Sequence, residues 1–339
     1  MKMKSGARQQ GFTLIELMVA LLLGLLVIAA AGSIFLSNRR VYGNTEAINR
    51  IQENQRAAFE ILARDIREAG GNPCTRFSDH PVSLRSAASG SAYWARFNGG
   101  IHGESGGTDA ITVYRANDMQ RQIVQHKAPE EPLVLNSAAG LVAGQDLIAC
   151  NNDAAIVFSV TAISGNEVSH DVSANCGKGM TREPDASKCT EPLAGPAYCF
   201  WGDPTVPPSA LEASKCQPGV GRSPAFVVQP AAVRWSVENN ARGGKSLYRT
   251  SPGGKDEIAE GVTGLSITYK VGDATRYVDA GTVDAGNAWA LVTAVHLAMT
   301  FEAVQGSMAR ADVEDIEGAT LTRSVEDVIV LRNHQGNIL

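Results

Sequence analysis

The hydrophobic residues of this chain are concentrated near its start. Residues 12–36 read FTLIELMVALLLGLLVIAAAGSIFL, 25 residues whose only charged side chain is Glu16. At about 1.5 Å of rise per residue, a helix of this length reaches about 37 Å, enough to cross a hydrocarbon layer of about 30 Å. The pattern predicts a transmembrane helix over residues 12–40.

Residues 44–69 alternate between apolar and charged positions. Apolar side chains recur at three- and four-residue steps and mark one helical face: Ile48, Ile51, Phe59, Leu62, Ile66 and Ala69. The opposite face carries Glu53, Arg56, Glu60, Arg64 and Arg67. Gly70-Gly71-Asn72-Pro73 is a strong stop signal. We therefore expect residues 41–73 to contain an amphipathic continuation of the helix and its end. Its apolar face would pack on the protein's own domain or, alternatively, in a coiled coil.

From residue 74 onward, short runs rich in β-branched residues predict a β-rich domain over residues 74–339. The predicted strands are Ala110–Arg115, Asp146–Ala149, Ala155–Ile163, Ala225–Val228, Val233–Val237, Ser246–Arg249, Leu265–Val271, Ala288–Phe301 and Val325–Leu331. No helical stretch alternates with these runs, which favours an antiparallel sheet over a parallel doubly wound one. The expected fold class is α+β, a long helix packed on an antiparallel β-sheet domain.

Residues 172–224 differ from the rest because they combine eight prolines with four cysteines, and they predict a long disulfide-stapled loop insertion. Six cysteines allow 15 pairings. We expect Cys74 to pair with Cys150, and two local bridges among Cys176, Cys189, Cys199 and Cys216. All six lie after the apolar segment, which places the C-terminal bulk in an oxidising compartment outside the cytoplasm.

Composition narrows the function further. The formal net charge is -5, from 30 basic and 35 acidic residues, so no nucleic-acid partner is predicted. Lys2, Lys4 and Arg8 precede the apolar segment and favour a cytoplasmic N-terminus, although Arg39 and Arg40 on the far side weaken this argument. Ala29-Ala30-Ala31 leaves open the alternative of a cleaved secretory signal.

Enzyme motifs are present only in unsuitable surroundings. Gly103-Glu104-Ser105-Gly106-Gly107 matches the Gly-x-Ser-x-Gly elbow, but a strand is predicted after it where a helix is required, so we expect a flexible loop. Gly243-Gly244-Lys245-Ser246 resembles the end of a phosphate-binding loop, yet the position for the first glycine is Asn239, and we expect a hairpin turn. The histidines, His80, His102, His126, His170, His296 and His334, form no constellation in the sequence. We predict no catalytic, cofactor or metal site and no enzymatic activity.

A carboxylate such as Glu16 inside an apolar helix is costly, and its bland interpretation is a side chain that reaches the headgroups. Gly11-Phe12-Thr13-Leu14-Ile15-Glu16, however, resembles the prepilin processing site of type IV pilins and of the pseudopilins of type II secretion. The resemblance implies that a prepilin peptidase removes residues 1–11 by cutting between Gly11 and Phe12, and that Phe12 is then N-methylated. It also implies that residues 12–40 form a filament-core helix and that Glu16 guides subunit docking by meeting the N-terminal amine of a neighbour.

Downstream segments are similar to PilW-type minor pilins. They are residues 143–150 and 155–158, Ser246–Arg249, Glu260–Tyr269, Trp289–Val295 and Val328–Asn333. The region Val271–Arg276 lacks the oxygen ligands of the calcium turn found in some relatives, so no calcium is predicted.

The resemblance implies a minor pilin that helps prime type IV pilus assembly as a low-abundance, tip-proximal subunit. Implied partners are the prepilin peptidase, inner-membrane lipid before assembly, the other minor pilins, the major pilin and a PilY-type tip adhesin. The chain would be a single-pass inner-membrane protein with a periplasmic domain, later carried to the cell surface in the pilus. Alternatives are a J-type minor pseudopilin of type II secretion, a surface adhesin or DNA-uptake module and, resting only on the elbow match, a membrane-anchored hydrolase.

Overall fold

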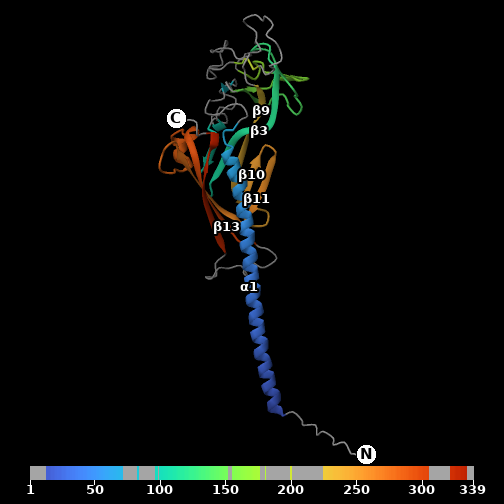
Figure 1. The fold of residues 1–339 in the computed structure, drawn as a ribbon, viewed down its shortest axis with the longest axis vertical. Coiled ribbons are helices and arrows are strands. Elements are labelled where there is room, and N and C mark those ends of the chain that lie inside the picture. Colours follow the sequence, from blue (N-terminus) through green and yellow to red (C-terminus); the bar gives the residue numbers. More distant parts are fainter. Residues whose placement is uncertain are drawn as a thin grey trace, which may run out of the picture. The chain divides into compact units, whose positions relative to one another are not determined.

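The protein consists of a long N-terminal helix followed by a β-rich domain (Figure 1). The computed structural model describes residues 13–71, 82–83, 96–97, 99–151, 155–175, 180, 199–200, 224–304 and 321–333. Two compact units divide the chain: the first holds Met1–Glu53 and Glu302–Thr322, and the second holds Asn54–Phe301 and Arg323–Leu339. The functional candidates below therefore fall on one unit or the other.

Helix α1 spans Leu14–Arg67 without interruption. Gly24, Gly32 and Gly43 do not break it, and its end comes where the stop signal predicted it. Gly70 adopts φ +68, a left-handed conformation that suits glycine. The Gly70 N–H donates to the Tyr114 carbonyl at 2.8 Å, and the Ala116 N–H donates to the Gly71 carbonyl at 2.9 Å. The helix end is thus hydrogen-bonded directly to a strand of the domain.

The strands form two sheets. The larger sheet contains β1 (Val82–Ser83), β2 (Ile101–Glu104), β3 (Ala110–Gln125), β4 (Leu133–Leu135), β5 (Asp146–Cys150), β6 (Ala155–Ser159), β7 (Ala162–Ser164), β8 (Glu167–Ser169), β9 (Phe226–Asn239), β10 (Lys245–Ser251) and β11 (Gly254–Glu260). The smaller contains β12 (Val262–Val271), β13 (Val292–Glu302) and β14 (Thr322–Val330), with the short helices α3 (Ala280–Ala285) and η3 (Trp289–Leu291) between β12 and β13. The antiparallel sheet domain and the long helix confirm the α+β prediction; one pair, β1 with β6, is parallel.

Strand β9 corrects the sequence prediction most clearly. The prediction divided it into Ala225–Val228 and Val233–Val237, with Pro230 in the gap between them. In the structure it is one strand, paired with β3, β5 and β10. Pro230 faces Ala116, where the β3 register shifts toward Gln120. The irregularity accommodates the proline, as bulges commonly do.

Other strand boundaries differ for local reasons. The predicted strand over Ala155–Ile163 is two strands, because β6 pairs with β5 and β7 pairs with β8. The predicted strand over Ala288–Phe301 begins later, since residues 289–291 form η3. Strand β11 was not predicted because its first residues, Gly-Lys-Asp-Glu, are polar and exposed. Most of the predicted insertion over residues 172–224 lies outside the described residues.

The second part of α1 packs on the sheet of its own unit. Ala58, Leu62, Ile66 and Ala69 are buried there, whereas Arg56, Glu60 and Arg64 are exposed, in agreement with the predicted faces. Ile48 and Phe59 are only partly buried. The Asn54 Nδ2 amide also donates to the Glu260 carbonyl at 2.9 Å, next to the β11 edge. Packing within the unit, rather than a coiled coil, accounts for the buried face after residue 53.

A buried carboxylate lies on this face. Asp65 is 4% exposed, and its Oδ2 accepts hydrogen bonds from Trp235 Nε1 at 3.0 Å and Arg249 Nε at 2.8 Å. Trp235 on β9 and Arg249 on β10 are direct cross-strand partners. Neighbouring pairs of this kind project on the same side of a sheet, so one carboxylate satisfies both donors. Asp65 therefore fixes the rotation of α1 over the β9–β10 pair.

Replacing Asp65 by Ala is expected to lower the free energy of unfolding by about 3 kcal/mol, because it leaves a guanidinium and a buried indole N–H without their acceptor. Asp65→Asn keeps one acceptor and should cost less. Urea unfolding of the full chain in neutral detergent, followed by tryptophan fluorescence, measures the change. Glu60→Ala is the control: it breaks an exposed pair with Arg56 on the same helix, expected to be worth less than about 1 kcal/mol. Equal losses for Asp65→Ala and Glu60→Ala would contradict the anchoring role.

Candidate processing and assembly segment

The first turn of α1 is closed by a reciprocal cap between Thr13 and Glu16. The Glu16 N–H donates to Thr13 Oγ1 at 3.4 Å, while the Thr13 N–H and Oγ1 donate to Glu16 Oε2 at 3.5 and 3.4 Å. This is the capping-box arrangement, in which a threonine and a glutamate three residues later satisfy each other's free backbone N–H groups. The Thr-Leu-Ile-Glu sequence carries this signal, which the sequence analysis missed.

Glu16 was predicted as a docking residue, and the structure places it, exposed, at the start of α1. Its carboxylate faces back toward Thr13, the residue that follows Phe12 in the chain. The predicted cleavage residues Gly11 and Phe12 themselves lie outside the described residues. The cap thus holds a negative charge at the helix N-terminus, where the helix dipole favours an anion.

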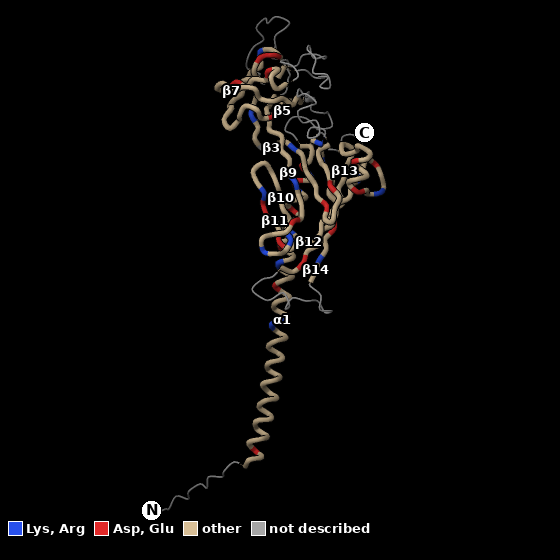
Figure 2. The backbone as a smooth tube through the Cα atoms, turned by 180° about the vertical axis from the view of Figure 1, so that it is seen from behind, with Lys and Arg blue, Asp and Glu red and all other residues tan. Residues whose placement is uncertain are grey.

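An uninterrupted apolar surface follows the cap. Every large hydrophobic residue from Leu14 to Leu36 is more than half exposed, between 52% and 78%. Figure 2 shows this stretch with almost no charged residues after Glu16. By length and composition, α1 suffices to cross a membrane, and none of its most apolar window is buried. An exposed apolar surface of this size requires lipid or other helices as its surroundings.

The described cysteines, Cys150 and Cys199, are both disulfide-bonded, and neither is a free thiol. The other four predicted disulfide residues, Cys74, Cys176, Cys189 and Cys216, lie outside the described residues. The pairing of Cys74 with Cys150 therefore stays a prediction.

The elbow match at residues 103–107 was predicted to be a flexible loop. Its first two residues instead belong to a strand. Ile101–Glu104 form β2, which pairs with β3 through an exposed turn that contains Ser105. Gly103 is needed for packing, because a Cβ at this position would overlap the hydroxyl of Tyr269 from β12. The turn is tied down by Asp109, which accepts from the N–H groups of Gly106 at 3.1 Å and Ile267 at 2.8 Å. The glycine of the motif serves sheet packing, and Ser105 follows a strand but precedes no helix.

In the second motif match, Gly243 and Gly244 lie in the predicted hairpin turn between the antiparallel strands β9 and β10, and Lys245 and Ser246 are the first residues of β10. Among the histidines, His80 and His334 lie outside the described residues. His102 contacts Asp284 at 3.3 Å, and its ring lies tilted against that of Trp289 with centroids 5.0 Å apart, an association that the sequence did not indicate. Burial, with a smaller contribution from Arg96, lowers the pKa of His102. Within the described ranges, no three His, Cys, Asp or Glu side chains are grouped to hold a metal ion.

His126 and His170 form a buried pair with ring centroids 6.2 Å apart. His126 Nδ1 accepts the Phe200 N–H at 3.0 Å, which requires the neutral ring, and His170 Nε2 contacts the Glu131 carbonyl at 3.1 Å. Burial first, and the neighbouring His170 second, lower the pKa of His126 to about 3. A histidine held neutral in this way serves as a hydrogen-bond acceptor for the Phe200 backbone, and it is a poor proton acceptor near pH 7.

Comparison with known proteins identifies the N-terminal segment. Residues 6–32 match the family described as Prokaryotic N-terminal methylation motif. This motif is typical of type IV pilin-like prepilins and indicates a type IV pilin-like or pseudopilin-like protein. It implies processing by a prepilin peptidase and pilin partners in general, and together with the apolar helix it fits membrane anchoring. No curated protein and no solved structure matches the chain.

Gly103→Ala is expected to lower the free energy of unfolding by about 2 kcal/mol, since the added methyl group must displace Tyr269. Adding Tyr269→Phe should restore part of the loss, because it removes the hydroxyl that the methyl group meets first. Ser105→Ala, two residues away and exposed, should change stability by less than about 0.5 kcal/mol. Urea midpoints of the four proteins measure this, and a neutral Gly103→Ala would disprove the packing role.

Acid should destabilise the protein through His126. The pKa of His126 is about 3 in the folded chain and 6.5 in a histidine outside the fold. The stabilisation that the neutral His126 gives the folded state is therefore complete above pH 6.5 and is lost as the pH falls toward 3. The loss has a slope of about 1.4 kcal/mol per pH unit in that window. His126→Gln keeps an acceptor for Phe200 without a titrating ring, and it should flatten this slope at some cost in stability at pH 7. Urea unfolding at several pH values between 7 and 5 provides the comparison; parallel slopes would contradict the assignment.

Proposed function

We propose that the chain is a structural subunit of a type IV pilus, cut after Gly11, methylated on the new amine of Phe12 and built into the filament through the apolar part of α1. The observation that carries the proposal is the Thr13–Glu16 cap at the head of an apolar helical stretch whose large side chains are all more than half exposed, within the segment that matches the methylation motif. Removal of residues 1–11 leaves 328 residues and changes the net charge from -5 to -8, since the leader holds three basic residues.

The chemistry of docking follows from the charges at the helix head. Cleavage creates an ammonium at Phe12, and Glu16 holds a carboxylate one helical turn away. Each charge is expensive in apolar surroundings, and each lowers the desolvation cost of the other when they meet. An ammonium from a neighbouring subunit reaching the Glu16 carboxylate satisfies both charges while the apolar faces pack. Helices of this kind leave lipid for the filament core without exposing their surface to water.

Within this class, the downstream resemblance favours a PilW-like minor pilin that primes assembly near the tip. The segments that carry the resemblance are sheet strands and edges, including β5, β10, β12 and β13. The large domain after the helix supports a rare subunit, since it is bulky for a repeating shaft. The proposed role is structural and involves no catalysis, in keeping with the positions of Gly103 and Ser105 in a hairpin.

The decisive test compares Glu16→Ala with Glu46→Ala in cells that lack the chromosomal copy. Glu16→Ala should still be cleaved and methylated, but its content in sheared filaments should fall by about tenfold or more, because an incoming ammonium would lack its partner. Glu46 lies on the same helix in an exposed pair with Arg50 at 2.6 Å, so its removal should leave incorporation unchanged. Quantitative mass spectrometry of sheared filaments and membranes measures both.

Three outcomes would change the conclusion. Undiminished incorporation of Glu16→Ala would remove the docking role. An intact leader, or cleavage at another bond, in the filament-borne or membrane-borne protein would overturn the processing step. If cells that lack the chain lost protein secretion but kept normal surface pili, the chain would belong to the pseudopilins of type II secretion, whose N-terminal chemistry is the same.

A further inference from the structure

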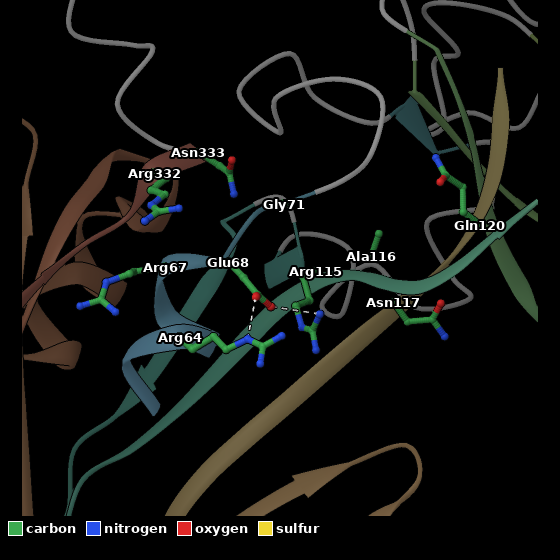
Figure 3. Close-up of a pocket in the computed structure, with 10 residues that line it drawn as sticks. All are labelled: Arg64, Arg67, Glu68, Gly71, Arg115, Ala116, Asn117, Gln120, Arg332 and Asn333. Carbon is green, nitrogen blue, oxygen red and sulfur yellow. Dashed lines mark hydrogen bonds and ion pairs between the residues drawn. The ribbon is translucent and has the colours of Figure 1, made fainter. Parts of the chain in front are cut away.

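The second unit contains a pocket whose walls are dominated by arginine. The pocket has a volume of about 640 Å³ and lies where three chain segments meet: the last turn of α1 with the residues after it, strand β3, and the residues after β14. Figure 3 shows its lining, which includes Arg64, Arg67, Arg115 and Arg332, with Glu68 as the one acid among the lining residues that the structure describes. The local formal charge is therefore +3 on a chain whose total is negative.

The internal ion pairs use only part of this charge. Glu68 Oε1 contacts Arg64 Nε at 3.2 Å, and Glu68 Oε2 contacts Arg115 Nη1 at 3.2 Å, so one carboxylate serves two guanidinium groups. Arg67 and Arg332 are exposed, and neither forms an ion pair with any residue that the structure describes. In Figure 3 these two side chains lie on the same side of the pocket. Two uncompensated guanidinium groups remain available to an incoming anion.

Helix electrostatics explains only part of the cluster. Basic residues in the last turn of a helix stabilise it by interacting with the negative end of its dipole, which accounts for Arg64 and Arg67. Arg115 on β3 and Arg332 after β14 come from other elements, and the helix does not require them. Like charges that converge from separate segments repel one another unless an anion lies between them, and Glu68 fills that place only for Arg64 and Arg115. Arg67 and Arg332 converge without such an anion among the described residues. Their convergence therefore favours a ligand.

The pocket is built on a rigid frame. Gly70 and Gly71 are hydrogen-bonded to β3, and Asn333 Nδ2 donates to the Ala69 carbonyl at 3.0 Å. Beside Gly71, the space that a Cβ would occupy is already filled by the Glu68 carbonyl and by Asn333 Nδ2. The chain segments that carry Arg67 and Arg332 are thereby joined, because Asn333 follows Arg332 and its side chain bonds the turn after α1. Guanidinium groups carried on segments joined in this way suit carboxylates, which they bind through paired N–H groups.

We infer that this pocket, formed by Arg64, Arg67, Arg115 and Arg332, is a docking site for a short acidic segment, rich in Asp or Glu, of a partner protein. A carboxylate-bearing peptide fits better than nucleic acid, because the four arginines line one local pocket of a chain whose net charge is negative, whereas a phosphate backbone is followed by an extended basic surface. The side-chain amide of Gln120 in the lining adds a group that can hydrogen-bond to a peptide backbone. The inference concerns the second unit alone and does not require the filament role.

The test uses the full chain in neutral detergent and a fluorescein-labelled hexaglutamate peptide, with hexaglutamine carrying the same dye as the reference. Fluorescence anisotropy at low salt should detect binding of hexaglutamate only, weakening as salt is raised. The double variant Arg67→Gln/Arg332→Gln should weaken binding by about tenfold or more, because two charge-assisted contacts are lost. Both positions are exposed, so unfolding midpoints should not change.

Arg276→Gln is the matched control, since Arg276 is an exposed arginine of the same unit outside the pocket. Its affinity for hexaglutamate should equal that of the unmodified protein. Equal affinity of the double variant and the unmodified protein would overturn the inference, as would equal binding of hexaglutamine. A labelled single-stranded oligonucleotide that bound more tightly than hexaglutamate, and lost its affinity in the double variant, would overturn the peptide assignment and make the pocket a nucleic-acid site.

Discussion

The structure depends on one buried carboxylate that joins the helix to the sheet. Asp65 brings a negative charge from α1 onto β9 and β10, where Trp235 and Arg249 stand side by side and both donate to it. A helix packed by Ala58, Leu62 and Ile66 alone has apolar contacts of little directional preference, and such contacts tolerate sliding and rotation. A hydrogen-bonded charge tolerates neither. The helix end, the β3 contacts of Gly70 and Gly71, and the arginine pocket beyond them all depend on that fixed rotation.

Glu16 and Asp65 are acids near opposite ends of α1, and they differ in whether the folded chain supplies a cationic partner. Asp65 has its cationic partner in the same unit. Glu16 has only the neutral groups of Thr13 among the described residues. A capping box satisfies hydrogen bonds but leaves the charge uncompensated, and the apolar surface around it offers no cation. One acid is therefore satisfied by folding, and the other is satisfied only by another molecule or by the processed N-terminus.

Much of the fold could be predicted from local sequence patterns, and the features that could not be predicted depend on contacts between distant segments. The apolar run after Phe12, the Gly70-Gly71 stop and most strands follow from periodicity and turn residues, because these are properties of neighbouring positions. The continuity of β9 through Pro230 could not be predicted in this way, since the register shift that accommodates the proline lies on β3. The reason for Gly103 lies 166 residues away in Tyr269. Arg67 was predicted on the charged face of the helix, and nothing in the neighbouring sequence indicated that the fold would bring it and Arg332 to one pocket.

The two proposed contact surfaces divide the tasks of assembly and selection between them. An apolar helix headed by one acid and one amine suits any helix built in the same way, so it supplies affinity with little discrimination. Choosing particular neighbours requires directional groups whose positions differ from one subunit to another. The proposed arginine site supplies directional groups, and a mismatched partner would leave Arg67 and Arg332 without anions. Such a site discriminates between partners because a charged group left unpaired in a complex costs free energy, and polar groups contribute to specificity mainly through this cost.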